Sequence, residues 1–292
     1  MIREVKKRRP VFGYKRVLAI LLLLALSIAL FILIRDVRER GISTPIEDKS
    51  RSGKKVRESL SVLEKTPTKK TCRIAIIIDD VGYDLSQVEE LLKIQAPLTF
   101  AVLPHCQHSR EAAERIHRAG KEVLLHLPME PLSHEKNPGK GVLLSGMSRD
   151  DIRNVLEEDL AAVPYAVGAN NHMGSRFMED ESGLRVLFEI LEEKGIFFVD
   201  SMTTVRSRGR AAAVDTGIPF IARDIFIDGG DKHDTNSEDF LKAVRMNGRR
   251  EGVVVIGHPY PSTIDTVRVS IEKLREEGLE VVPVSKLVKR QP

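Results

Sequence analysis

Short apolar runs alternate with amphipathic stretches along most of the chain after residue 71. The apolar runs predict buried strands at 73–78, 98–103, 122–127, 165–169, 196–199, 219–227 and 252–256. Residues with helical spacing separate them, at 85–94, 108–119, 150–163, 183–194 and 263–277. Because continuous apolar strands are buried on both faces, this alternation predicts parallel strands covered by helices. Seven or eight such units in about 215 residues predict an α/β fold, an irregular seven-stranded (β/α) barrel.

A separate apolar segment precedes this pattern. Residues 17–34, VLAILLLLALSIALFILI, carry no charge and would extend about 27 Å as a helix, enough to cross the core of a bilayer. A signal peptide would have a shorter apolar region followed by small residues at a cleavage site. Here the pairs Ala25-Ser27 and Ser27-Ala29 lie inside the run, and FILI continues past them. We therefore expect a single uncleaved transmembrane anchor.

The charges beside this segment predict its orientation. Residues 6–16, just before it, supply six cations, namely Lys6, Lys7, Arg8, Arg9, Lys15 and Arg16. They favour a cytoplasmic N-terminus, although the three arginines at 35–40 weaken the bias. The expected order is a basic cytoplasmic N-terminus at 1–16, an anchor in the cytoplasmic membrane at 17–34, a polar flexible linker at 35–71, and a folded domain at 72–289 on the periplasmic or extracellular face.

The net charge of +4 is concentrated at this N-terminal end. No stripe of Lys and Arg interleaved with aromatic residues follows in the predicted domain, and the chain has no Trp. Binding to nucleic acid usually leaves such a basic footprint. We therefore expect no nucleic-acid partner.

Polar side chains gather where the predicted strands end. They are Asp79 and Asp80 after the first strand, His126 at the third, Asn170, Asn171 and His172 at the fourth, Asp200 at the fifth, Asp228 at the sixth and His258 at the seventh. The C-terminal ends of the strands form the face where (β/α) barrels hold their active sites. Neighbouring strand residues point to opposite faces, so we expect one of the paired aspartates to enter the site and the other to support it.

The motifs at these positions resemble the divergent branch of the polysaccharide deacetylase (NodB-like) superfamily. IIIDDVG at 76–82 stands where the superfamily has its TFDDG-type motif. GKEVLLHLPME at 120–130 stands at the histidine motif, with Glu130 in place of the second histidine. VGANNHMGSR replaces the arginine-proline motif, while FFVDS and GHP supply a later aspartate and the terminal histidine. The resemblance covers roughly residues 72–288 and implies the irregular barrel of NodB-like deacetylases.

The resemblance also implies a metal centre. Asp79 would be the general base, and Asp80 and His126 would be metal ligands. Glu130 occupies the family's third ligand position, whereas His172 offers an imidazole nitrogen from the next strand. Because imidazole suits zinc, we expect Asp80, His126 and His172 to bind a divalent metal, Zn²⁺, with Glu130 as the alternate ligand.

His258 and Asp200 complete the implied machinery. His258 would protonate the leaving amine, and Asp200 would orient its imidazole and stabilise the charged form. A bound metal ion would lower the pKa of a water molecule and polarise the attacked carbonyl. The arginine motif of the superfamily is absent from this chain.

Other polar groups on this face each have two interpretations. Asn170 and Asn171 either bind substrate or shape a turn. Asp228 lies in the loop IDGGDKHD, which either contacts a substrate or second metal or forms a solvated rim. The three arginines within 206–210 either bind an acidic substrate or solvate their loop.

Three functions from different classes fit these observations. The first is a membrane-anchored, metal-dependent hydrolase that cleaves C–N bonds of N-acetyl or amide groups in an envelope glycan, such as a peptidoglycan-like polymer. The second is a catalytically silent barrel that binds an envelope glycan or a partner protein. The third is a metal phosphohydrolase. The resemblance favours the first.

Overall fold

The computed structural model describes residues 72–229, 236–247 and 252–291. Its strands are β1 (Arg73–Val81), β2 (Thr99–Val102), β3 (Glu122–Met129), β4 (Ala166–Met173), β5 (Phe197–Asp200), β6 (Pro219–Ala222), β7 (Ile225–Phe226), β8 (Gly252–Gly257), β9 (Glu280–Val281) and β10 (Lys289–Arg290). Its helices are α2 (Leu85–Leu92), α3 (Ser109–Arg118), α4 (Arg149–Ala162), α5 (Glu181–Glu193), α6 (Gly209–Thr216), α7 (Ser237–Asn247) and α8 (Pro261–Glu276), with 3₁₀ turns at Phe177–Glu179 and Val284–Lys286.

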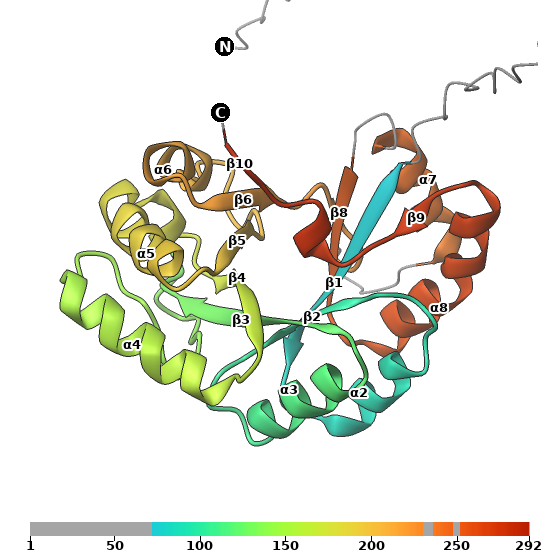
Figure 1. Cartoon of the computed structure of the whole chain (residues 1–292), viewed down its shortest axis with the longest axis horizontal. Helices are drawn as coiled ribbons and strands as arrows, with labels where there is room; N and C mark the ends of the chain where they lie inside the picture. Colours follow the sequence, from blue (N-terminus) through green and yellow to red (C-terminus); the bar gives the residue numbers. More distant parts are fainter. Residues whose placement is uncertain (1–71, 230–235, 248–251, 292) are drawn as a thin grey trace, which may run out of the picture. The chain divides into compact units, whose positions relative to one another are not determined.

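The strands form one curved sheet, and the helices lie along its outer side (Figure 1). The strand order is β10-β6-β5-β4-β3-β2-β1-β8-β7, with β9 paired to β1 beside this path. Neighbouring strands are parallel, except that β10 runs antiparallel to β6. The predicted class, parallel strands covered by helices, is confirmed.

The barrel is open at one place, because the predicted sixth strand is two strands. β6 pairs with β5, whereas β7 pairs with β8 at the other edge of the sheet. Arg223 and Asp224 cross the gap between them: the Arg223 N–H donates to the Asp200 carbonyl, and the Asp224 N–H donates to the Val254 carbonyl. The fold is therefore a half-barrel with a bridged seam.

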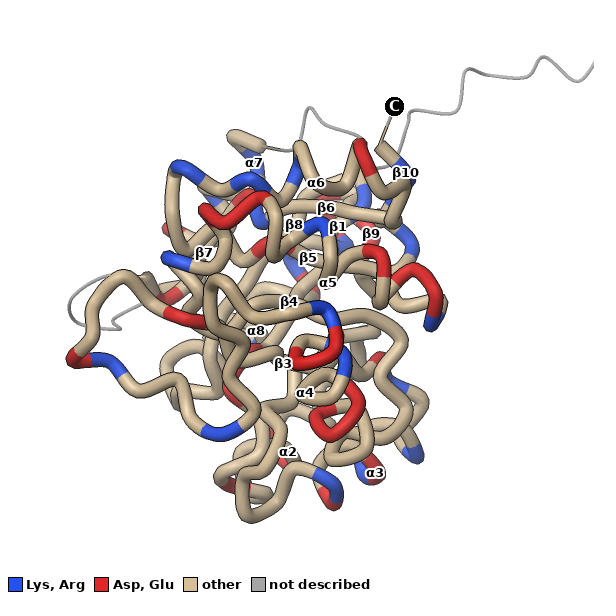
Figure 2. Tube along the Cα trace, turned by 90° about the vertical axis from the view of Figure 1, so that its left-hand side faces the viewer, with Lys and Arg blue, Asp and Glu red and all other residues tan. Residues whose placement is uncertain are grey.

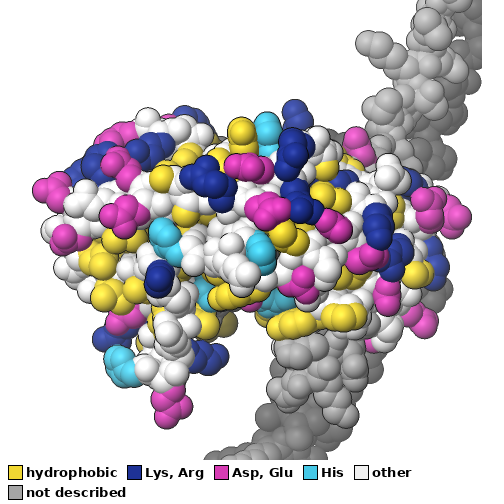
Figure 3. All heavy atoms as spheres, turned by 90° about the horizontal axis from the view of Figure 1, so that it is seen from below, with side chains coloured by type: hydrophobic (Ala, Val, Ile, Leu, Met, Phe, Trp, Pro, Cys, Tyr) yellow, Lys and Arg dark blue, Asp and Glu magenta, His cyan; other side chains and the backbone are white. Residues whose placement is uncertain are grey.

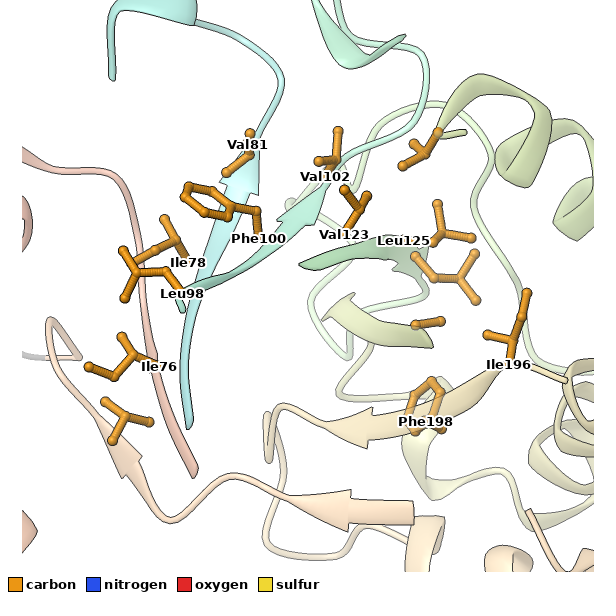
Figure 4. Packing of buried hydrophobic residues seen from close by; sticks show 14 of the residues in the cluster. Ile76, Ile78, Val81, Leu98, Phe100, Val102, Val123, Leu125, Ile196 and Phe198 are labelled. Carbon is orange, nitrogen blue, oxygen red and sulfur yellow. The ribbon is translucent and has the colours of Figure 1, made fainter. Parts of the chain in front are cut away.

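Side chains alternate between the two faces of β1. Ile74, Ile76 and Ile78 pack against the helices, whereas Ala75 and Ile77 face the barrel interior. Figure 4 shows the helix-side layer, in which side chains from β1, β2, β3 and β5 pack together. Burial on both faces explains the continuous apolar runs of the sequence.

The outer surface is charged with both signs. Arg149 and Arg153 of α4 contact Glu189 and Glu193 of α5, and Figure 2 shows acidic and basic residues near the labels of both helices. Acidic and basic side chains are also mixed over the face seen from below (Figure 3). Exposed pairs of this kind contribute little to stability, about 0–1 kcal/mol each.

The sequence pattern did not predict α6 or α7. Only Ala212, Ala213 and Gly209 of α6 are buried, so it has no apolar stripe to recognise. Within the described ranges, no helix is long and apolar enough to cross a membrane. The predicted anchor at 17–34 and linker at 35–71 lie outside those ranges, and both remain predictions.

Candidate active site

A β-bulge at the end of β1 brings two adjacent aspartates to the same side of the strand. The pairing of β1 with β2 shifts register between Ile78 and Val81. Asp80 has φ 56°, in the left-handed region that residues other than glycine seldom adopt. Asp79 and Asp80 consequently both line the same cavity. The expectation that only one of them would enter the site is wrong, because the bulge cancels the normal alternation of the strand.

Three side chains from β1, β3 and β4 converge beside this bulge. Asp80 Oδ1 lies 3.1 Å from His126 Nε2 and 2.9 Å from His172 Nδ1, and these two nitrogens are 3.1 Å apart. Ligand atoms of a tetrahedral zinc site lie about 3.3 Å apart, given bonds of 2.0–2.1 Å. Asp80 Oδ1 is buried and accepts no hydrogen bond from any residue that the structure describes. An orphaned carboxylate oxygen beside two imidazole nitrogens fits a divalent cation.

Asn170 connects this cluster to Asp79. Its Oδ1 lies 2.8 Å from His126 Nδ1, and its Nδ2 donates to Asp79 Oδ1 at 2.8 Å and to Ser201 Oγ at 3.2 Å. An amide oxygen can only accept a hydrogen bond, so it selects the tautomer with a proton on Nδ1 and leaves the Nε2 lone pair facing Asp80 and His172. Asn170 thus orients a candidate ligand and the candidate base together.

The two aspartates differ in electrostatic environment. Burial raises the pKa of Asp79, and the charge of His126 and the Asn170 hydrogen bond only partly oppose this. Burial acts the same way on Asp80, but contacts with His126 and His172 outweigh it and hold the Asp80 pKa well below its ordinary value. These directions fit Asp79 as the candidate base and Asp80 as a candidate metal ligand.

Burial and neighbouring charges also have opposite effects on the pKa of His126. Burial disfavours its charged form, but the neighbouring Asp79 and Asp80 outweigh burial and raise the His126 pKa to about 9. Without a metal ion the pocket thus attracts a proton. A bound cation would take the place of that proton, because imidazole ligates metals only in its neutral form.

His258 lies on the opposite wall and is held by Asp228. Its Nδ1 lies 3.0 Å from Asp228 Oδ1, its backbone N–H donates to Asp228 Oδ2 at 2.6 Å, and Nε2 lies 3.6 Å from Asp80 Oδ2. The Thr263 hydroxyl also donates to Asp228 Oδ2 at 2.8 Å. Burial alone lowers the pKa of His258, but Asp228 and the more distant Asp80 and Asp79 reverse this and raise it. His258 is a candidate proton donor.

Asp200 does not orient His258, so that expectation is wrong. Asp200 follows Val199, which faces the barrel interior, and strand alternation therefore turns the Asp200 side chain toward α6. There it accepts from the Ser207 hydroxyl at 2.6 Å and from the Met202 N–H at 2.7 Å. A Cβ on Gly209 at the start of α6 would meet Asp200 Oδ2 at 3.0 Å. Asp200 stabilises this loop. Asp228 makes the contact with His258 that was predicted for Asp200.

The side chains predicted to contact substrate make hydrogen bonds within the protein. Asn170 is fully buried, and Asp228 is only 2% exposed with its carboxylate on His258. Asn171 is 1% exposed, accepts from the Ser201 N–H, and donates to the Met173 carbonyl and the Thr203 hydroxyl. Asn171 lines the cavity and Asn170 and Asp228 do not, but the hydrogen-bonding groups of all three are occupied by protein.

Glu130 does not join the candidate ligands. Its Oε2 accepts from the Ser145 N–H at 2.9 Å, and its Oε1 pairs with Arg176 Nε at 3.2 Å. Among the described residues, only Asp80, His126 and His172 form a group of potential metal ligands close enough to share an ion. The structure favours His172 over Glu130 as the third candidate ligand.

A cavity of about 540 Å³ opens above the cluster, within the range of small-molecule sites. It is lined by Asp79, Asp80, His126, His172 and His258. Arg223 and Phe226 also line it, and the sequence pattern did not indicate either. Both lie in the apolar run at 219–227, which the sequence pattern predicts to be one strand. The charged residues Arg223 and Asp224 interrupt this run, and only that interruption could have suggested a role in the site.

Comparisons with known proteins agree with the motifs. Residues 76–288 match the family model described as "Divergent polysaccharide deacetylase". An uncharacterized protein of Escherichia coli K12, YibQ, is 36% identical over 203 residues, which are 69% of this chain and 63% of YibQ. The matched region thus spans a little under two thirds of that relative.

Solved structures share the fold. An uncharacterized protein from Agrobacterium tumefaciens, ATU2773, superposes with a TM-score of 0.69 at 22% identity, covering 75% of this chain and 89% of that one. The catalytic domain of a peptidoglycan N-acetylglucosamine deacetylase from Eubacterium rectale superposes with a TM-score of 0.51 at 16% identity. The superposition covers 76% of this chain and 92% of that one. At such identities the likeness concerns the fold alone. From the family match over residues 76–288, this chain belongs to the divergent polysaccharide deacetylase family.

Proposed function

We propose that this protein is a metal-dependent hydrolase that removes N-acetyl groups from, or cleaves amide bonds of, an envelope carbohydrate. The observation that carries the proposal is the orphaned Asp80 oxygen between His126 and His172, flanked by a buried carboxylate and a histidine–carboxylate pair. Family membership supports the substrate class. Zn²⁺ is the expected metal, because two nitrogen donors and one carboxylate match its preferred ligands.

The residues of the chain divide the chemistry between two walls of the cavity. A divalent cation held by Asp80, His126 and His172 would polarise the amide carbonyl and acidify a water molecule. Asp79 accepts a proton from the water molecule as the water oxygen bonds to the carbonyl carbon. His258 donates a proton to the nitrogen as the C–N bond breaks, which gives acetate and a free amine. Asp228 stabilises the charged imidazole before this transfer.

We further propose that residues 17–34 anchor the protein in the cytoplasmic membrane, with the catalytic domain on the periplasmic or extracellular side. The support is the uncharged apolar segment of 18 residues and the cations before it. On fractionation, the full-length chain should stay with the membranes after washing with salt or alkali. A soluble, N-terminally processed form recovered from cells would contradict the anchor.

The activity is tested with zinc-loaded full-length protein on N-acetylated glycans and on phosphate esters. We expect acetate release from at least one glycan, loss of release on chelation, and recovery when zinc is added back. Phosphate release without acetate release would favour a phosphohydrolase. Glycan binding without either product would favour a catalytically silent barrel.

A further inference from the structure

Arg223 lies in the wall shared by two cavities at the barrel seam. The first is the cavity of about 540 Å³ at the candidate active site, and the second, of about 470 Å³, is lined by Ser207 and Arg210 among others. Met202 and Arg223 line both. The shared lining places Arg223 within reach of one ligand that also contacts Asp79 and His258.

The guanidinium of Arg223 is fixed in place. Its Nε donates to the Ser201 carbonyl at 2.8 Å, and its Nη2 donates to the Met202 carbonyl at 3.2 Å. Its Cζ lies 4.5 Å from the centroid of the Phe226 ring, which makes an edge contact with the His258 ring at 5.4 Å. The charge is thus held near the candidate proton donor with little freedom to move, which reduces the entropy lost on binding a ligand.

One edge of this guanidinium is open. Nη1 makes no hydrogen bond to any residue that the structure describes, and within the same residues no carboxylate lies within 4 Å of the group. Asp200, a neighbouring acid, is occupied by the Ser207 hydroxyl and the Met202 N–H. Burial lowers the pKa of Arg223, and the charges of Asp79 and Asp200 oppose the shift, so the group remains a cation.

We propose that Arg223 binds a carboxylate of the substrate, so that the site takes an acidic N-acetylated glycan rather than a neutral one. This inference rests on the proposed function, because it places the acetamido group at the metal cluster and the sugar acid at the seam. A monoanion matches the single open edge, whereas a phosphate dianion would leave excess negative charge near Asp79 and Asp80.

Binding of matched probes tests this proposal. The probes are a hyaluronan tetrasaccharide, which alternates N-acetylglucosamine with glucuronate, and its uncharged methyl ester. Calorimetry uses zinc-loaded full-length protein with Asp79→Asn, which lacks the base, so turnover does not disturb the titration. A charge-assisted hydrogen bond should make the acid bind about tenfold or more tightly than the ester.

Variants then locate the effect. Arg223→Gln should bind acid and ester equally, with unchanged affinity for the ester and for zinc. Arg223→Lys should keep part of the preference. Arg206→Gln is the matched control, because Arg206 is exposed and pairs with Glu179 at 3.0 Å, and it should keep the full preference. All variants are made in the Asp79→Asn protein, which is the parent. If Arg223→Gln fails to fold, comparing acid and ester binding in the parent and in Arg223→Lys still tests the proposal.

Equal binding of acid and ester by the parent protein, a preference that survives in Arg223→Gln, or no binding of either probe would overturn the proposal. Tighter binding of N-acetylglucosamine 6-phosphate than of the tetrasaccharide acid would contradict the choice of a carboxylate. Because no binding readout depends on turnover, the two proposals can fail separately. An acid preference in Asp79→Asn, together with no acetate release by the wild-type protein, would refute the proposed function and leave only the contact between Arg223 and a carboxylate.

Discussion

Two histidines face the same cavity, and each is held through Nδ1 by a different kind of partner. His126 faces the neutral amide of Asn170 at 2.8 Å, whereas His258 faces the carboxylate of Asp228 at 3.0 Å. A neutral acceptor orients an imidazole without demanding that it be charged, as a metal ligand requires. A carboxylate stabilises the imidazolium, as a proton donor requires. We propose that this difference in the Nδ1 partner separates the candidate ligand, His126, from the candidate acid, His258.

Removing each histidine should give the largest contrast. His126→Ala should lose the metal ion, because one of three ligands is gone. His258→Ala should keep the metal but lose about 10²–10⁴-fold of its turnover on amides, and less on activated esters whose leaving groups need no proton. Metal content by mass spectrometry and rates on the two substrate types are the measurements. Equal metal loss in both variants would erase the proposed division of roles.

Asp79→Asn tests the base without touching the ligands. We expect the metal to stay and turnover to fall about 10²–10⁴-fold, because the amide cannot accept the proton of the water. Metal content and acetate release, measured on the same sample, check this. Unchanged turnover would show that another group is the base.

Exchanging the partner of His258 should have a smaller effect. Asp228→Asn removes a charge-assisted contact, which is worth about 1.5–3 kcal/mol, and should lower turnover on amides about 10–100-fold with the metal retained. Asp200→Asn is the control, because that carboxylate contacts Ser207 and Met202 instead. The ratio of amide to ester turnover should fall in Asp228→Asn and stay unchanged in Asp200→Asn.

Changing Asn170, the partner of His126, should affect metal affinity and turnover to different degrees. Asn170→Asp keeps an acceptor for His126 Nδ1 but cannot donate to Asp79 in its ionised form. We expect metal affinity to persist while turnover falls about tenfold, from the loss of one hydrogen bond to a charged group. Asn170→Leu, which removes both bonds, should weaken metal binding as well. If both variants bind metal equally well, Asn170 does not orient the ligand.

The histidine–carboxylate pair of His105 and Asp159, away from the cluster, gives the smallest expected effect. His105 Nε2 lies 2.8 Å from Asp159 Oδ1, and burial, aided by the charge of Glu158, raises the Asp159 pKa from 3.8 to about 8. Between these values the folded protein keeps a proton that the unfolded chain has released. The stability from this group is therefore complete below about pH 4 and is lost as pH rises through 8.

Asp159→Asn should remove this dependence. The free energy of unfolding of the wild type, relative to the variant, should fall by roughly 1–3 kcal/mol between pH 4 and pH 8. Urea unfolding of both proteins across that range measures the difference. A flat difference would mean that Asp159 is ionised in the folded state.

The sequence predicted the main strands and the cluster at their C-terminal ends, because apolar runs and the polar residues that end them are local signals. It did not predict the orientation of Asp80 or Asp200. The first depends on a bulge, and the second on which face of β5 Val199 occupies. Asp228 was recognised as polar, but its contact with His258 joins residues 30 positions apart. Such contacts follow from the folded sheet.

The location of the metal tests the account most directly. We predict that an anomalous difference map at the zinc absorption edge, from crystals of the zinc-loaded protein, will show one strong peak bonded to Asp80, His126 and His172. In that map His126 Nδ1 should still face Asn170, and Glu130 should remain on Arg176. A zinc-loaded crystal with no peak there, or with Glu130 in place of His172, would contradict the assignment of the site.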